Sequence, residues 1–263
     1  MKKILLVLFS LTVLFAGEGL PVLTLPTFAQ DGYMPSSPVY KEKGITFSYA
    51  SWYKATNYTS IVTELGDVTF GFKGLMSSDL EIRGEVPTDE PIGLTQYYNS
   101  TVFLNKNWNL NDKWTLNTGA SLINEKLFIA GSWGGTVDMK IIRNFNVNSR
   151  VMLGVENIGW MSTLSNVATN IPARYYFGSD FILFDFLILS MQAGVNNDID
   201  PYLRAGIRYF HPVFELTYSH DTMLKVHHFG ADLKWDKFRI GYGQYLHSQG
   251  IGSPMMFSFG MVF

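Results

Sequence analysis

Hydrophobic and polar residues alternate with a period of two along most of the chain from position 44 onward. In residues 202–209, for example, every second residue is apolar and the positions between them hold Arg204, Gly206 and Arg208. A period of two predicts β-strands, and an apolar row opposite a polar, glycine-rich row suits strands with lipid on one side and water on the other. Fourteen such runs can be counted, at 44–53, 57–65, 67–75, 94–106, 113–122, 128–142, 149–157, 171–177, 180–192, 201–210, 212–219, 226–235, 237–246 and 253–263.

The connections between these runs sort by length. Every second connection is short: Gly66, 107–112, 143–148, Gly178 with Ser179, His211 and Asp236. The two longest connections, 76–93 and 158–170, both belong to the other set. Membrane barrels have short periplasmic turns and longer extracellular loops, whereas a soluble sandwich has no reason to sort its loops this way. The pattern predicts an all-β transmembrane antiparallel up-and-down β-barrel of about 14 strands, with 12 as the lower alternative.

The last run strengthens this prediction. One of its faces is formed entirely by large apolar residues, namely Met255, Phe257, Phe259, Met261 and Phe263. A free hydrophobic edge strand would promote aggregation in a soluble protein, but in a barrel it pairs with the first strand and lipid covers its apolar face. A terminal aromatic residue preceded by alternating apolar residues is similar to the assembly signal of outer-membrane barrels. We therefore expect an outer-membrane location, with outer-membrane lipid and the barrel assembly machinery as partners.

The N-terminus is typical of an export signal. Lys2 and Lys3 precede an apolar run that ends at Ala16 and is too short to span a membrane as a helix. Two cleavage sites remain open: Ala16 ends the apolar run, whereas Thr27 at the third position before the bond favours cleavage after Ala29. We expect residues 1–29 to be the signal peptide, 30–43 an irregular segment and 44–263 the barrel.

The segment before the barrel contains four prolines in residues 20–43, which break the hydrogen bonding of helices and sheets. Irregular backbone is tolerated at membrane depth only where protein or water surrounds it. We therefore predict that much of 20–43 forms a short lumen plug against Arg204, Arg208 and Arg239. Its apolar residues Leu20, Val22, Leu23 and Leu25 would line a path for hydrophobic ligands.

Composition agrees with an exported β-barrel. Aromatic residues make up 15% of the chain and charged residues only 16%, against about 25% charged residues in soluble domains. The chain has no cysteine, which excludes disulfides and thiolate metal sites, and its net charge of −2 offers no surface for nucleic acid. We expect no cofactor and no metal.

Charged residues recur on the predicted polar faces. The lumen-lining candidates are Lys73, Arg150, Glu156, Arg204, Arg208, Glu215, Asp232, Lys234 and Arg239. Both signs interleave, unlike the one-sign ring of an ion-selective pore. The set predicts a lumen wall stiffened by ion pairs, and the alternative is a polar conduit for solutes.

Three short motifs resemble catalytic or metal sites. Ser219, His220 and Asp221 are the residue types of a hydrolytic triad, but consecutive strand residues point to opposite faces, and an extracellular loop is the better interpretation. The adjacent His227 and His228 meet the same objection as a metal pair. The oxygen-rich turn 196–200 lacks the length and final Glu of a calcium loop. The sequence predicts no enzyme.

Several stretches together resemble the PorV/PorQ family of outer-membrane proteins, relatives of the fourteen-stranded FadL-type barrels. They are GITFSY at 44–49, GTVD at 135–138, LGVENIG at 153–159, Pro172 at a strand start, LRAG at 203–206, FGA at 229–231 and YG at 242–243. The Asn-Pro-Ala turn of the family is reduced here to Met34, Pro35 and Ser36, and the glycine-, alanine- and arginine-rich segment before it is nearly gone.

This resemblance implies two non-enzymatic functions. FadL-type barrels imply passive transport of small, including hydrophobic, molecules across the outer membrane. PorV implies a partner or scaffold of a protein export or surface-attachment machine, binding a secreted protein through the loops 76–93 and 158–170. The sequence places transport first and identifies neither the ligand nor the partner.

Overall fold

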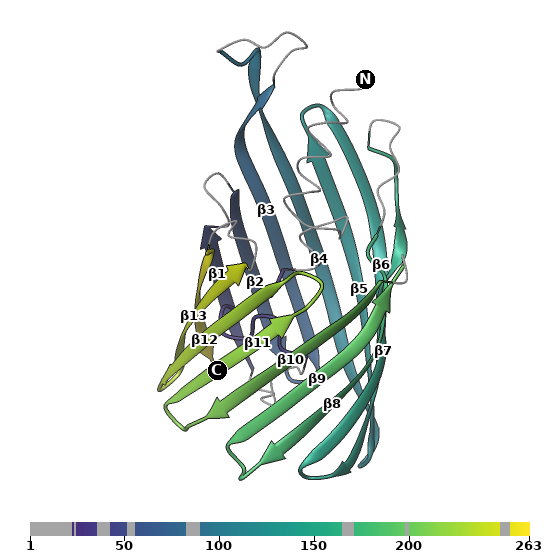
Figure 1. The fold of residues 1–263 in the computed structure, drawn as a ribbon, viewed down its shortest axis with the longest axis vertical. Coiled ribbons are helices and arrows are strands. Elements are labelled where there is room, and N and C mark those ends of the chain that lie inside the picture. Colours follow the sequence, from purple (N-terminus) through teal and green to yellow (C-terminus); the bar gives the residue numbers. More distant parts are fainter. Residues whose placement is uncertain are drawn as a thin grey trace.

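The computed structural model describes residues 23, 25–35, 43–51, 56–82, 90–164, 171–197, 200–247 and 253–263. Fourteen antiparallel strands form a closed barrel, which confirms the predicted fold class (Figure 1). The strands are β1 (Gly44–Ser51), β2 (Thr56–Leu65), β3 (Val68–Ile82), β4 (Gly93–Asn111), β5 (Trp114–Leu127), β6 (Ala130–Asn146), β7 (Ser149–Met161), β8 (Arg174–Leu183), β9 (Leu187–Asn196), β10 (Pro201–Phe210), β11 (Phe214–Asp221), β12 (Val226–Trp235), β13 (Phe238–His247) and β14 (Met255–Val262).

Each strand pairs with its neighbours in sequence, and the barrel closes where β1 meets β14. Gly44 lies opposite Val262 and Ser51 opposite Met255, so the two strands match over their whole length. The amide of Phe263 adds a hydrogen bond of 2.9 Å to the carbonyl oxygen of Lys43. Closure leaves no edge strand, which is what a sheet in lipid requires.

The strand connections sort to the two ends of the barrel. Connections after even-numbered strands span only two or three residues, and they lie at the end that also holds Gly44 and Phe263, which we call the turn end. Gly66 and Asp236 occupy such turns with φ of 71° and 53°. The opposite end, which we call the loop end, carries the two longest connections, β3 to β4 and β7 to β8 (Figure 1).

Several predicted boundaries are wrong. The expected loop 76–93 is strand at both its ends, because β3 continues to Ile82 and β4 begins at Gly93. The expected turn at Gly178 and Ser179 lies within β8, and the chain reverses at 184–186 instead. The expected connections 107–112 and 143–148 shrink to two residues each, and β7 extends the expected strand to Met161. Small and polar residues in these stretches occupy strand positions because they point into the lumen, where such residues are common.

The strands differ greatly in length. Most have 8 to 10 residues, close to the 9–11 or so that a tilted strand needs to cross a membrane. In contrast, β4 has 19 residues, β6 has 17 and β3 has 15. These longer strands rise above the rest of the barrel at the loop end (Figure 1). The barrel therefore has one tall wall and one low wall.

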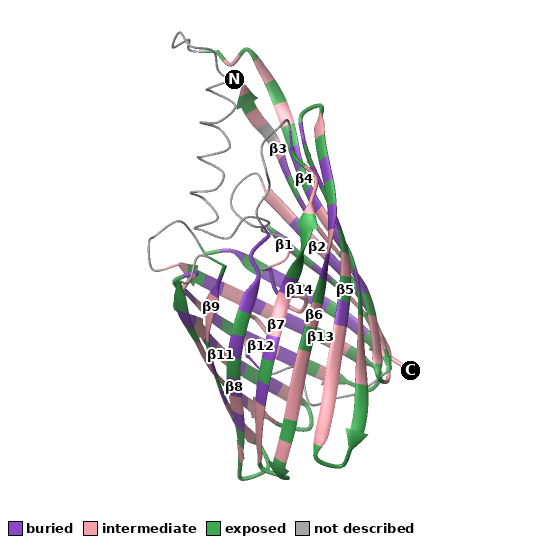
Figure 2. Cartoon of the chain, turned by 90° about the vertical axis from the view of Figure 1, so that its right-hand side faces the viewer, coloured by how far each residue is buried: buried purple, intermediate pink, exposed green. Residues whose placement is uncertain are grey.

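Burial alternates along the strands, as the colours in Figure 2 show. The outward residues of β14 are large and apolar, and Phe257, Phe259 and Phe263 are 53–61% exposed. The inward residues on the same strand, Met256 and Ser258, are buried. Among the described residues no helix is both long and apolar enough to cross a membrane. An apolar outer surface on a closed barrel is the arrangement of an outer-membrane protein.

The lumen is apolar near the loop end. Inward side chains there form a buried cluster, which we call the apolar seal: Leu25, Ala29, Tyr33, Ala50, Tyr58, Leu75, Tyr97, Leu127, Leu164, Leu224, Val226, Tyr245 and Met256. Strands β1 to β5 and β12 to β14 all contribute to it. An aqueous pore would carry polar residues at these positions. The seal instead packs like the core of a soluble protein.

Candidate functional site

Residues 25–35, which we call the plug segment, lie inside the barrel. Their polar backbone is satisfied by inward side chains of the wall. Lys73 donates to the carbonyl oxygen of Leu25 at 2.8 Å, and Tyr58 donates to that of Pro26 at 2.7 Å. Ser60 donates to the carbonyl oxygen of Thr27 at 2.7 Å. Buried backbone groups need such partners, so the wall supplies what a helix or sheet would otherwise provide.

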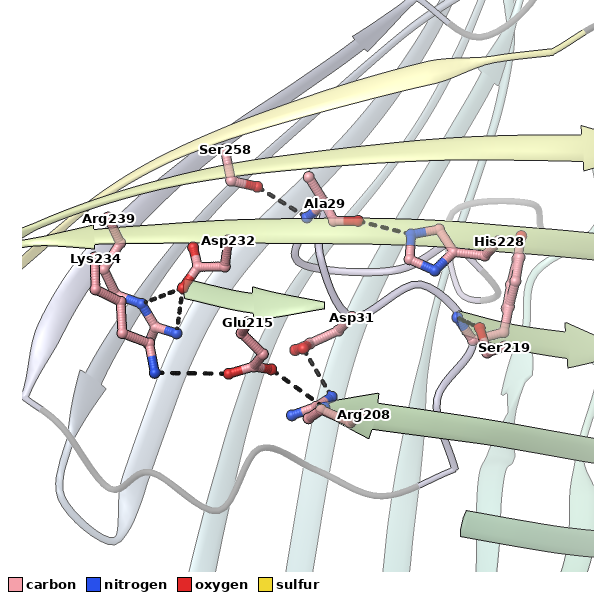
Figure 3. Close-up of polar contacts among 11 residues, drawn as sticks. Ala29, Asp31, Arg208, Glu215, Ser219, His228, Asp232, Lys234, Arg239 and Ser258 are labelled. Atoms are coloured by element: carbon pink, nitrogen blue, oxygen red, sulfur yellow. Dashed lines mark hydrogen bonds and ion pairs between the residues drawn. The ribbon is translucent and has the colours of Figure 1, made fainter. Parts of the chain in front are cut away.

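Further along the plug segment, the low wall holds the chain (Figure 3). The amide of Ala29 donates to Ser258 Oγ at 2.8 Å, and Nε2 of His228 lies 2.9 Å from the carbonyl oxygen of Ala29. The amide of Tyr33 donates to Ser219 Oγ at 3.2 Å. These contacts come from β11, β12 and β14, so the segment spans several strands.

Glycines in the polar rows make room for this segment. A side chain on Gly230 would overlap the carbonyl of Gln30, and one on Gly243 would overlap that of Ala29. A side chain on Gly206 would overlap the sulfur of Met34. The glycine-rich polar face seen in the sequence is therefore the surface against which the plug segment lies.

Ion pairs join the plug segment to the wall (Figure 3). Nη2 of Arg208 donates to Oδ1 of Asp31 at 2.9 Å, while Nε of Arg208 lies 3.3 Å from Oε1 of Glu215. Lys234 approaches the other oxygen of Glu215 at 3.7 Å. The side chains of Arg208 and Glu215 are 1% and 2% exposed. Buried charges are tolerated only with such partners. Asp31 gives Arg208 a second carboxylate partner, in addition to Glu215 of the wall.

All nine charged candidates from the sequence occupy inward strand positions. Beyond the network around Arg208, Arg150 pairs with Asp180, Arg204 with Asp221 and Arg239 with Asp232. Glu156 and Lys73 line the cavity described below. Of the three arginines expected to contact the plug, Arg208 binds Asp31 and Arg204 lies 5.9 Å from the ring of Tyr33. Arg239 binds the wall residue Asp232 through two nitrogens.

Sequence reasoning missed three carboxylates in these pairs, namely Asp31, Asp180 and Asp221. For two of them the strand bounds decide. Asp180 lies directly opposite Arg150 in the β7–β8 register, but the turn expected at Gly178 and Ser179 assigned Asp180 to the next strand. Asp221 lies opposite Arg204, but the expected strand ended at Ser219. Asp31 carries no register signal because it belongs to no strand.

A cavity of about 640 Å³ lies between the plug segment and the inner faces of β2 to β10. Its lining reaches Gly66, Asn109, Thr115 and Asn144 near the turn end. Toward the loop end it stops at residues such as Leu25, which is part of the apolar seal. Pockets for small molecules have volumes of roughly 300–1,000 Å³, so the cavity can hold one.

Of the plug residues expected to line a hydrophobic path, Leu25 borders one end of the cavity. Leu25 is 4% exposed within the apolar seal, and Leu23 packs against it. Leu20 and Val22 lie outside the described residues, as do 36–42 and most of the expected signal peptide.

The catalytic and metal motifs separate as alternation requires. Ser219 and Asp221 point inward and His220 points outward, but the three residues lie in β11 and not in the expected loop. His228 binds Ala29 inside the barrel, while His227 stacks on His220 at 4.2 Å between ring centroids on the outer face. Across the described part of the chain, no three His, Cys, Asp or Glu residues lie close enough together to hold a metal ion.

Comparisons with known proteins bear on the fold. No protein-family model matches the chain, and no curated protein does. Among solved structures, the toluene transporter TodX of Pseudomonas putida superposes with a TM-score of 0.54 at 11% identity, covering 95% of this chain and 98% of that one. A TodX variant described as a monoaromatic hydrocarbon channel gives 0.51 at 10% identity, covering 94% and 99%. The chain therefore shares the barrel fold of these structures, and a closed fourteen-stranded barrel with an apolar outer face is an outer-membrane protein.

Proposed function

We propose that this protein is a non-enzymatic outer-membrane channel for small molecules, closed at rest by the plug segment and the apolar seal. The observation that carries the proposal is the cavity of about 640 Å³ inside the barrel, bounded on one side by a segment that belongs to no strand. A fourteen-stranded barrel is too wide for its own wall side chains to fill, since about eight strands already suffice for that. Displacing the plug segment would therefore open a route through the lumen without any movement of the wall strands.

The size of the plug segment depends on which signal cleavage site is used. Cleavage after Ala16 keeps the whole plug segment, whereas cleavage after Ala29 removes Leu25 to Ala29. Asp31, which pairs with Arg208, and Tyr33, which binds Ser219, are retained in both cases. Mass spectrometry of the mature chain identifies the form present.

Single-channel recording in planar bilayers tests the gate. We expect small or rare currents from the full chain and larger ones from a variant that begins at residue 41 behind a foreign signal peptide. A second variant, Met34→Cys with Gly206→Cys, places two thiols at positions whose side chains face each other, since a side chain on Gly206 would reach the sulfur of Met34. The chain has no other cysteine, so oxidation ties the plug segment to β10 and reduction releases it. If a folded barrel gives the same current with and without the plug segment, and in the oxidised and reduced states of the cysteine pair, the proposal is contradicted.

The resemblance to FadL-type barrels implies more specifically that the transported molecules are hydrophobic. TodX is described as a transporter of one such compound, toluene. The second candidate is a PorV-like scaffold for an export or surface-attachment machine. The apolar seal favours the scaffold, because a scaffold has no need of an open lumen. The tall wall of β3 to β6 also favours it, because it raises strand surface above the rest of the barrel, where a protein partner could bind. A barrel that stays silent even without the plug segment, and copurifies with a secreted protein, supports the scaffold.

A further inference from the structure

The cavity wall carries both signs of charge in equal number. Four acidic and four basic side chains line it, namely Asp31, Glu64, Asp138, Glu156, Lys73, Lys140, Arg150 and Arg204. A solute with a net charge would be attracted by half of them and repelled by the other half, so ions of neither sign gain a net attraction. A hydrocarbon would remove water from all of them and offer no hydrogen bond in return, which is costly for charged groups. The lining therefore disfavours hydrocarbons and selects for neither cations nor anions.

The wall toward the turn end is built from amides and hydroxyls. Asn105, Asn107 and Asn109 follow one another on the inward face of β4, and Thr115 and Asn117 face them from β5. Nδ2 of Asn117 donates to Oδ1 of Asn107 at 2.9 Å, and Oγ1 of Thr115 donates to Oδ1 of Asn109 at 3.5 Å.

An amide offers both donors and acceptors at one position. The Asn107–Asn117 bond uses one oxygen and one nitrogen, which leaves Nδ2 of Asn107 and Oδ1 of Asn117 for a solute. This pair, with the Thr115–Asn109 pair beside it, matches a molecule whose own groups both donate and accept, which is the property of a hydroxyl.

The opposite wall is of another kind. The plug segment presents Phe28, Met34 and Pro35 to the cavity. A solute held here meets hydrogen-bonding groups on one side and apolar surface on the other. Molecules with a rim of hydroxyls around C–H faces have this two-sided chemistry.

We propose that the cavity binds an uncharged, polyhydroxylated small molecule, of the sugar or polyol class. This inference rests on the proposed channel and names its solute class, against the hydrophobic ligand that the fold resemblance implies. The assignment comes from the amide row, the balance of charge and the apolar face of the plug segment taken together.

Equilibrium binding in nanodiscs tests the solute class without requiring any current. Saturation-transfer NMR on the full chain would use maltose, glutamate, lysine and toluene as probes, with empty nanodiscs subtracted. We expect saturable binding of maltose and weaker or absent binding of the other three. The double variant Asn107→Leu with Asn117→Leu should weaken maltose binding at least about tenfold, because two hydrogen-bonding groups are lost.

The matched control is Asn124→Leu, the same change on the outward face of β5. It should leave maltose binding unchanged, and heat-modifiable migration shows that each variant is folded. Preferred binding of toluene, or equal loss in the control and the double variant, overturns the inference. Currents from the plug-free barrel without maltose binding would contradict the sugar-binding cavity and support the channel. Maltose binding without any such current would support the sugar-binding cavity and contradict the channel.

Discussion

Asp31→Asn tests the ion pair that holds the plug segment. Oδ1 of Asp31 lies 2.9 Å from Nη2 of Arg208, whose side chain is 1% exposed, while the side chain of Asp31 is 14% exposed. A hydrogen bond to a charged group contributes about 1.5–3 kcal/mol to stability. Arg208 keeps Glu215 at 3.3 Å after the change, so we expect a loss near the lower end of that range, about 1.5–2 kcal/mol. This loss lowers the ratio of docked to undocked plug roughly 10- to 30-fold.

Open probability in planar bilayers measures this ratio directly. We expect Asp31→Asn to raise it by about that factor, and Asp31→Lys to raise it further because two cations then face each other. Asp236→Asn is the control, since it makes the same chemical change at an exposed turn residue. The melting temperature of the barrel should change little in all three, because the strand register does not involve Asp31. Equal open probabilities in Asp31→Asn and Asp236→Asn would show that the ion pair does not hold the plug segment.

Three further predictions concern assembly, topology and packing. Deleting Phe263 or replacing it with Lys should leave the chain periplasmic, because the last outward apolar position is lost, and fractionation with heat-modifiable migration checks this. Epitope tags at 85 and 165 should be reachable on intact cells and a tag at 236 should not, and the reverse pattern would invert the barrel. Gly159→Ala should lower the free energy of unfolding by about 1–3 kcal/mol, since the new methyl group would overlap the carbonyl oxygen of Gly135 and lie 2.8 Å from the Cα of Thr136. Gly93→Ala, whose nearest neighbour lies at 3.9 Å, should leave the free energy of unfolding unchanged, and urea titration compares the two variants.

The packing prediction also explains two of the stretches that resemble PorV/PorQ. Residues 135–138 and 153–159 pair across β6 and β7, and the register shifts between Val137 and Met139. At the bulge, Asn157 has a φ of 58° and its amide donates to Oδ1 of Asp138 at 2.6 Å. The two motifs are thus one local structure, a bulge held by a carboxylate. Sequence reasoning listed them separately because a bulge interrupts the period of two on which the strand count depends.

Much of the barrel follows from the sequence alone. The number of strands, the outward face of β14 and the inward position of all nine charged candidates depend only on alternation along each strand, which is a local property. Short turns at Gly66 and Asp236 also follow locally, because Gly and Asp tolerate the positive φ that such turns need. The same alternation predicts that Ser219 and Asp221 lie on the opposite face of the strand from His220.

Other features depend on contacts between residues far apart in sequence. Alternation cannot say that Leu75, Leu127 and Val226 point inward to a dry seal, because an apolar residue in a barrel strand ordinarily faces lipid. It cannot find the reversal at 184–186 either, where Phe184 and Asp185 have positive φ without glycine. The course of residues 25–35 is decided by Arg208, Ser219, His228 and Ser258, which only barrel closure brings to one place. The sequence by itself determined a lipid-facing barrel, because consecutive residues of a strand face opposite sides and their polarity shows which side meets lipid. Only the tertiary structure decided what fills its lumen, because that depends on which strands face one another across it.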